Sequence, residues 1–238
     1  MGISNTYFQF KQFRIAQEKC AMKVTTDACI QGAWTPVSNN VRRILDIGTG
    51  TGLLALMMAQ KASDAVIDAI DLDHNAVEQA IENITASAWS NIIHILERDA
   101  AIYTSDIKYD LIITNPPFFN NSLLSGKTDK DIARHTLTLS YKTLFHTIEQ
   151  NLSDNGYASI LLPEPESQIW ENMIKNNGWF ISSKLQVKHR ASAPVKRVIS
   201  IIQRHDTPTQ LETLTIQDEN NIYSDYFIEL LAPYYLNL

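Results

Sequence analysis

The tetrapeptide Asn115-Pro116-Pro117-Phe118 contains the residue types needed to hold a weakly nucleophilic amine for reaction. An exocyclic amine on adenine is a poor nucleophile, because its lone pair is delocalised into the ring. The Asn115 side-chain oxygen and the Pro116 carbonyl could both accept hydrogen bonds from such an amine and stabilise positive charge on it. The prolines fix φ and hold the carbonyls in place, while Phe118 offers a flat face on which an extruded base could stack. Asn115, Pro116 and Phe118 are therefore candidate catalytic residues.

A second candidate site is the glycine-rich stretch from Asp46 to Gly52, which contains Gly48 and Gly50. Glycines let the backbone turn sharply and approach a ligand closely. Asp71 lies 19 residues after Gly52, at the end of the next expected strand, where a carboxylate can accept both hydroxyls of a ribose. Asp46 would repel a pyrophosphate, but it suits a ligand that carries a sulfonium and an ammonium group. The pattern therefore argues against a dinucleotide and predicts a different nucleotide-type cofactor.

These glycines and acids resemble the class I S-adenosylmethionine-dependent methyltransferases. The resemblance implies that the glycine turn holds the methionine part of the cofactor, that Asp71 binds its ribose and that Asp99 contacts its adenine. For Asp73 we prefer a structural role as a helix N-cap. The tetrapeptide 115–118 resembles the N/D-P-P-Y/F/W loop of enzymes that methylate amino groups, and its phenylalanine favours a nucleic-acid base over a protein glutamine. No zinc-type Cys/His spacing occurs, so we expect direct methyl transfer without a metal.

The elements that position these residues belong to an α/β fold, because short β-branched runs alternate with longer helical patterns from about Arg42 onward. We predict strands over 43–47, 65–71, 92–97, 109–114 and 157–162, and helices over 53–61, 74–86, 138–150 and from Pro163 to about Gly178. Residues 180–188 and 197–204 should form an antiparallel pair, because only a short loop joins them. The expected fold is a Rossmann-like, doubly wound, mostly parallel sheet of seven strands with an antiparallel terminal hairpin.

The length of 238 residues, 45% of them hydrophobic, predicts a single domain over residues 1–238. Within it we expect an N-terminal decoration and cofactor-capping segment (1–40), a catalytic α/β core (41–204) and a C-terminal extension (205–238). The extension either closes the core or supports self-association, and the polar segment 119–134 is a candidate mobile loop. No apolar stretch is long enough to span a bilayer, so we expect a cytoplasmic protein, and we expect a monomer.

The charge of the chain is unevenly distributed. A net charge of −6 argues against a protein that coats nucleic acid indiscriminately. Residues 1–24 nevertheless carry four basic residues against one acid, and residues 180–204 carry six against none. This indicates a basic patch that grips one anionic partner, although basic residues that protect strand edges would give the same pattern. The candidate substrate-binding residues are Lys184, Lys188, Arg190, Lys196 and Arg197.

The segment 22–34 provides a further candidate cofactor residue. Thr26 could cap a helix that starts at Asp27, and the free N–H groups of that helix would suit the cofactor's carboxylate. The chain closely resembles the tRNA1(Val) adenine N6-methyltransferases over about residues 8 to 204. Residues 10–14, 22–34, 115–118 and 189–197 carry this resemblance. The chain departs from the family's pattern at Ala28 and Gln31, where glycine and leucine are expected.

The family resemblance implies an enzyme that transfers a methyl group from S-adenosylmethionine to N6 of adenine(37), directly 3′ of a tRNA anticodon, by base flipping. The basic residues of 180–204 would then grip phosphates of the anticodon arm. Three alternatives remain: a protein-glutamine N5-methyltransferase on the same scaffold, a DNA adenine N6-methyltransferase, and a cofactor-binding module that recognises RNA without modifying it. The DNA enzyme is disfavoured because no target-recognition domain fits in 238 residues, and Asn115 counts against the module.

Overall fold

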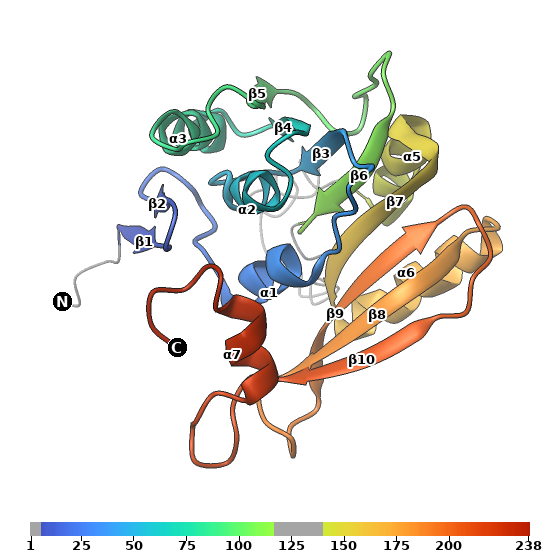
Figure 1. Cartoon of the computed structure of the whole chain (residues 1–238). Coiled ribbons are helices and arrows are strands. Elements are labelled where there is room, and N and C mark those ends of the chain that lie inside the picture. The colour runs from blue at the N-terminus through green and yellow to red at the C-terminus, as the bar shows by residue number, and fades with distance from the viewer. Residues whose placement is uncertain (1–5, 117–139) are drawn as a thin grey trace, which may run out of the picture.

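The structure is a computed structural model that describes residues 6–116 and 140–238. The strands of its main sheet are β3 (Arg43–Ile47), β4 (Val66–Asp71), β5 (Ile93–Glu97), β6 (Tyr109–Thr114), β7 (Leu152–Pro163), β8 (Phe180–Lys188), β9 (Val195–Gln203) and β10 (Gln210–Thr215). Their order across the sheet is β10-β8-β9-β7-β6-β3-β4-β5 (Figure 1). Strand β9 runs antiparallel to β7 and β8, and the other neighbouring pairs are parallel. The expected doubly wound, mostly parallel fold with an antiparallel hairpin is confirmed.

Helices cover both faces of the sheet. They are α1 (Thr26–Trp34), α2 (Leu53–Lys61), α3 (His74–Thr85), α5 (Tyr141–Asn151), α6 (Glu164–Asn176) and α7 (Asp225–Leu231). Alternate residues of a strand point to opposite faces. In β6, Leu111 and Ile113 join the core under α1, α2, α3 and α7, whereas Ile112 joins the core under α5 and α6. Two apolar layers therefore sandwich the sheet, which explains why its central strands contain near-continuous apolar runs.

Most of the expected elements coincide with observed ones to within two residues. Strands β3, β6 and β8 have the expected bounds, and the expected helix 138–150 corresponds to α5, with residues 138 and 139 outside the described part of the chain. The main difference is β10, which adds an eighth strand to the seven expected and pairs parallel with β8. The sequence of β10, QLETLT, does not alternate apolar and polar residues as a half-buried strand does. In the structure only Leu214 of this strand is buried.

The two terminal segments pack against each other. Strands β1 (Tyr7–Gln9) and β2 (Arg14–Ala16) form a hairpin, and the backbone N–H of Lys11 in its turn donates to the Tyr234 carbonyl at 2.8 Å. Phe10 forms an isolated bridge with Tyr235. Helix α7 buries Phe227 in the core beside α1. The C-terminal extension therefore closes the core, which the sequence left open.

Strand β3 lies at the point where the order of strands reverses. The chain proceeds from β3 to β4 and β5 on one side and then returns to β6 on the other side of β3. Open α/β sheets bind ligands at such a switch, beyond the carboxyl ends of the strands. The residues at the carboxyl ends of β3, β4 and β6 therefore lie at the expected ligand site.

None of the helices in the described residues combines the length and apolar character that a membrane crossing requires.

Candidate functional site

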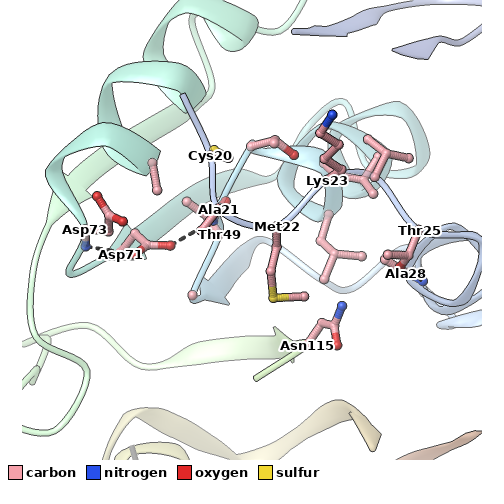
Figure 2. A pocket seen from close by; sticks show the side chains of 17 residues that line it. Cys20, Ala21, Met22, Lys23, Thr25, Ala28, Thr49, Asp71, Asp73 and Asn115 are labelled. Atoms are coloured by element: carbon pink, nitrogen blue, oxygen red, sulfur yellow. Dashed lines mark hydrogen bonds between the residues drawn. The ribbon is translucent and has the colours of Figure 1, made fainter. Parts of the chain in front are cut away.

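A pocket opens at the carboxyl ends of β3, β4 and β6 (Figure 2). Its walls come from four parts of the chain: the glycine-rich loop after β3, the acids after β4, Asn115 after β6, and the segment 20–28 that leads into α1. The pocket lining includes Met22, Thr25, Gly48, Gly50, Asp71 and Asn115. The topology thus brings together residues that lie far apart in the sequence.

The glycine-rich loop leaves open space for a ligand. Gly48 and Gly50 have φ values of +71° and +56°, which side-chain-bearing residues rarely adopt, and a Cβ atom at either position would have no neighbour within 4 Å. The backbone N–H groups of Gly48 and Thr49 both donate to the Ile70 carbonyl at the end of β4. The loop is therefore folded back over β4, with an uncovered surface at both glycines.

Asp71 is held in place by two backbone groups. Its Oδ2 accepts from the Gly50 N–H at 2.8 Å, and its Oδ1 accepts from the Asp73 N–H at 3.0 Å. Each carboxylate oxygen has a further lone pair, so Asp71 can still accept two hydroxyl groups. Asp73 also lines the pocket, and its side chain accepts from the Asn75 N–H at 2.8 Å as the N-cap of α3, which confirms its structural role.

Asp46 lies beneath the loop and does not line the pocket. It is completely buried, and its Oδ2 accepts hydrogen bonds from the Thr49 hydroxyl at 2.6 Å and the Ala55 N–H at 3.2 Å. Its Oδ1 has no hydrogen-bond partner among the described residues. Burial raises the pKa of Asp46 from 3.8 to about 7, although the two hydrogen bonds act in the opposite direction. The carboxyl group thus stabilises the glycine-rich loop from its buried side.

The raised pKa of Asp46 predicts a pH dependence of stability. A carboxyl group with a raised pKa binds its proton more tightly in the folded protein, so it makes stability fall as pH rises from about 4 to about 7. Asp46→Asn lacks this titration. Between pH 5 and pH 8 the wild type should therefore lose on the order of 2 kcal/mol of unfolding free energy relative to the variant. Urea unfolding of both proteins at the two pH values measures this, and a constant difference would contradict the prediction.

Asn115 follows β6 directly and lines the pocket. Its Oδ1 atom is buried and has no hydrogen-bond partner in residues 6–116 and 140–238. A buried amide oxygen without a partner is costly and calls for an explanation, such as a ligand. Pro116 is buried beside it. Of the expected catalytic residues, Phe118 lies outside the described residues, as does the expected loop 119–134.

Helix α1 places its N-terminus at the pocket, but the capping residue differs from the one expected. Thr25, with extended backbone angles, is the N-cap, and its hydroxyl accepts from the Ala28 N–H at 3.2 Å. Thr26 is the first helical residue and does not line the pocket, so its expected role as the cap was wrong. Adjacent threonines can both cap, and the backbone conformation selects Thr25.

The segment 17–25, here called the strap, crosses from β2 to α1 along the pocket. The Lys19 N–H donates to Gln79 on α3 at 3.1 Å, and the Val24 N–H donates to Gln17 at 2.9 Å. In Figure 2 the side chain of Met22 points from the strap toward Asn115. Met22 was not identified from the sequence as a site residue, although its place just before the capped helix was a usable signal.

Asp99, like Asp46 and Thr26, is an expected cofactor residue that does not line the pocket. It lies in the loop after β5, and its Oδ1 accepts from the Ala101 N–H at 2.8 Å. A contact between Asp99 and the adenine of a cofactor stays a prediction.

The five expected substrate-binding residues differ in their partners. Lys184 makes an ion pair with Glu171 on α6, whereas Arg197 makes one with Asp27 in the first turn of α1, at 3.1 Å. Lys188 ends β8 and Lys196 is exposed near the start of β9. Arg190, in the loop between them, donates to Asn221. A role of these residues in substrate binding stays a prediction.

The described residues contain no cluster of three or more His, Cys, Asp or Glu side chains arranged to hold a metal ion.

Sequence comparisons agree with this geometry. Residues 35–152 match the family model described as "Methyltransferase small domain". The chain is 39% identical to a Bacteroides fragilis protein named tRNA1(Val) (adenine(37)-N6)-methyltransferase, over 99% of this chain and 100% of that protein. It is 40% identical to a Trichodesmium erythraeum protein of the same name, over 96% of this chain and 97% of that protein.

Solved structures share the fold at low identity. An Agrobacterium tumefaciens protein described as a predicted O-methyltransferase superposes with a TM-score of 0.65 at 14% identity, over 90% of this chain and 100% of that chain. Mitomycin 7-O-methyltransferase superposes with a TM-score of 0.52 at 15% identity, over 75% of this chain and 53% of that chain. At these identities the likeness establishes the fold alone.

Proposed function

Because the chain belongs to the family of tRNA1(Val) (adenine(37)-N6)-methyltransferases, we propose that it transfers a methyl group from S-adenosylmethionine to the exocyclic N6 of an adenine in tRNA. The finer proposal is that the target is adenine(37) in the anticodon arm of tRNA1(Val). We also propose that the enzyme acts in the cytoplasm as a monomer.

The residues around the pocket fit S-adenosylmethionine. The uncovered backbone at Gly48 and Gly50 leaves room for the amino-acid part of the cofactor, and Asp71 keeps two acceptor positions for ribose hydroxyls. The buried Asp46 supports the glycine-rich loop through its hydrogen bonds with Thr49 and Ala55. The Thr25-capped N-terminus of α1 suits a carboxylate. When bound, the cofactor supplies an electrophilic methyl group on a sulfonium sulfur.

A single observation carries the proposal: the unpartnered amide oxygen of Asn115 borders the same pocket as Asp71 and Gly50. In the proposed reaction, Asn115 Oδ1 and the Pro116 carbonyl accept hydrogen bonds from the adenine amine. These bonds would localise the nitrogen lone pair and stabilise the positive charge that develops on the amine before it loses a proton. Neither the reaction nor its residues call for a metal ion.

The proposed function is tested by incubating the pure protein with methyl-labelled S-adenosylmethionine and, in separate reactions, with total tRNA, a translation-factor protein or duplex DNA. Digestion of the tRNA to nucleosides should yield labelled N6-methyladenosine. Label that remains in the protein substrate after ribonuclease treatment would indicate the glutamine methyltransferase. Label in duplex DNA would indicate the DNA enzyme. Cofactor binding without transfer to any of the three would indicate an RNA-recognition module.

The loop between β8 and β9 is the proposed contact with the anticodon arm. Strand β7 runs parallel to β6, and Pro163 at its carboxyl end pairs with Arg197 on β9. Lys188 and Lys196 therefore lie at the edge of the sheet that holds the pocket, as does Arg190 between them. Basic side chains at this edge could bind phosphates while the target base enters the pocket.

Changing Lys188 and Lys196 together to alanine should weaken tRNA binding about tenfold at low salt, because two phosphate contacts are lost. The slope of log affinity against log salt should also become shallower. Cofactor affinity should not change. The matched control is Lys184→Ala. Lys184 belongs to the same hairpin, but its side chain pairs with Glu171. Filter binding over a salt series measures these effects, and equal losses in the double variant and the control would refute the proposed contact.

A further inference from the structure

The side chain of Gln31 joins three elements below the pocket. Gln31 is on α1 and is completely buried. Its Nε2 donates to the Thr114 carbonyl on β6 at 2.9 Å and to the Ser159 carbonyl on β7 at 3.2 Å. Nearby, the hydroxyls of Thr35 and Ser159 are 2.7 Å apart. A single amide thus links α1 to the last residue of β6 and to an interior residue of β7.

The Thr114 carbonyl belongs to the peptide unit that leads into Asn115. The Thr114 hydroxyl donates to the Ile47 carbonyl at 2.9 Å, so this end of β6 is also tied to the end of β3. On the other side of Gln31, the same helix begins after its N-cap Thr25, and both Thr25 and Ala28 line the pocket. Gln31 therefore connects the helix that borders the pocket with the backbone that carries Asn115.

Stability alone does not account for glutamine at this position. The Oε1 atom of Gln31 is buried without a hydrogen-bond partner among the described residues. A buried acceptor of this kind costs free energy, which an apolar side chain of similar volume would not incur. Other buried side chains of α1, such as Ile30 and Ala33, contribute apolar contacts to the core. The Gln31 amide is thus a polar link between this helix and the backbone of β6.

We propose that Gln31 is a positioning residue for methyl transfer: its amide holds the Thr114 carbonyl and thereby fixes Asn115 relative to the pocket wall formed by α1. The inference rests on the proposed function of Asn115 as the acceptor of the amine's hydrogen bonds. A displacement of reacting groups by about 1 Å can slow a reaction about 100-fold, so a bond that fixes the backbone next to Asn115 affects the rate without touching the substrate.

The test compares Gln31→Met and Gln31→Leu with wild type in single-turnover methylation of tRNA. The expected result is a rate of methyl transfer about tenfold lower, with the dissociation constant of S-adenosylmethionine changed less than about twofold. The matched control is Thr35→Val, which removes the hydroxyl contact to Ser159 in the same cluster but no contact to Thr114. The control should transfer methyl groups at the wild-type rate.

A double-mutant cycle separates positioning from a general structural effect. In an Asn115→Ala background the Gln31 change should lower the residual rate less than about twofold, because the group that it positions is absent. Equal effects in both backgrounds, wild-type rates in the Gln31 variants, or loss of folding in both variants would each overturn the inference. If the wild-type protein itself leaves tRNA unmethylated, the proposed function fails instead.

Discussion

Replacing Asn115 with alanine should lower the rate of methyl transfer to tRNA about 100- to 1,000-fold. A hydrogen-bond acceptor or donor aimed at charge that develops in the transition state has an effect of about this size. Asn115 contributes such an acceptor, because its Oδ1 is buried at the pocket without another partner among the described residues. This oxygen supports no other described residue by a hydrogen bond, so its removal should change stability little.

Single-turnover rates with saturating cofactor measure this effect, and isothermal titration with S-adenosylhomocysteine checks that the pocket still binds. Cofactor affinity should stay within about twofold of wild type, because the acceptor acts on the amine. Asn115→Asp is the matched variant: it keeps an acceptor oxygen and should retain more activity than Asn115→Ala. Methyl transfer at the wild-type rate in the alanine variant would remove the basis of the proposed mechanism.

Replacing Asp71 with alanine should weaken cofactor binding about 100-fold or more. The change removes two acceptor positions for ribose hydroxyls, each worth about 1.5–3 kcal/mol when the acceptor is charged. It also removes the carboxylate that receives the Gly50 N–H, so the glycine loop loses one of its supports. Titration with S-adenosylhomocysteine measures the dissociation constant, and circular dichroism confirms that the variant is folded.

Glu97→Ala is the control for Asp71. Glu97 is also an acid at the carboxyl end of a strand, β5, but it pairs with His74 at 2.7 Å and does not line the pocket. Its removal should leave cofactor affinity within about twofold of wild type. Equal losses in both variants would show that general electrostatics, and not a specific contact of Asp71, governs binding.

The central strands were predictable because burial on both faces imposes long apolar runs on them. The stretch 109–114 has this character, and its bounds agree with β6. Strand β10 and helix α7 were not identified, because each buries few residues: Leu214 in β10, and Phe227 and Leu231 in α7. Both elements form by packing against residues that are distant in sequence, and no local sequence pattern predicts those contacts.

The candidate site likewise has features that the sequence predicts and features that depend on the fold. Spacing within one turn predicted that the backbone at Gly48 and Gly50 could approach a ligand closely, and both glycines do face open space. The hydrogen bond between Asp71 and Gly50 was not predicted. Spacing could not predict that Lys184 would pair with Glu171, because that contact depends on how α6 packs against β8. Gln31 was visible only as a departure from a family pattern, and its link to Thr114 required the fold.

The contact between the N-terminal hairpin and the last residues of the chain determines when the pocket can be completed during synthesis. The hairpin turn at Lys11 is synthesised long before its partner Tyr234. The strap begins directly after this hairpin. A nascent chain that has not reached Tyr234 therefore lacks this contact, and we expect it to hold the start of the strap less firmly than the full chain.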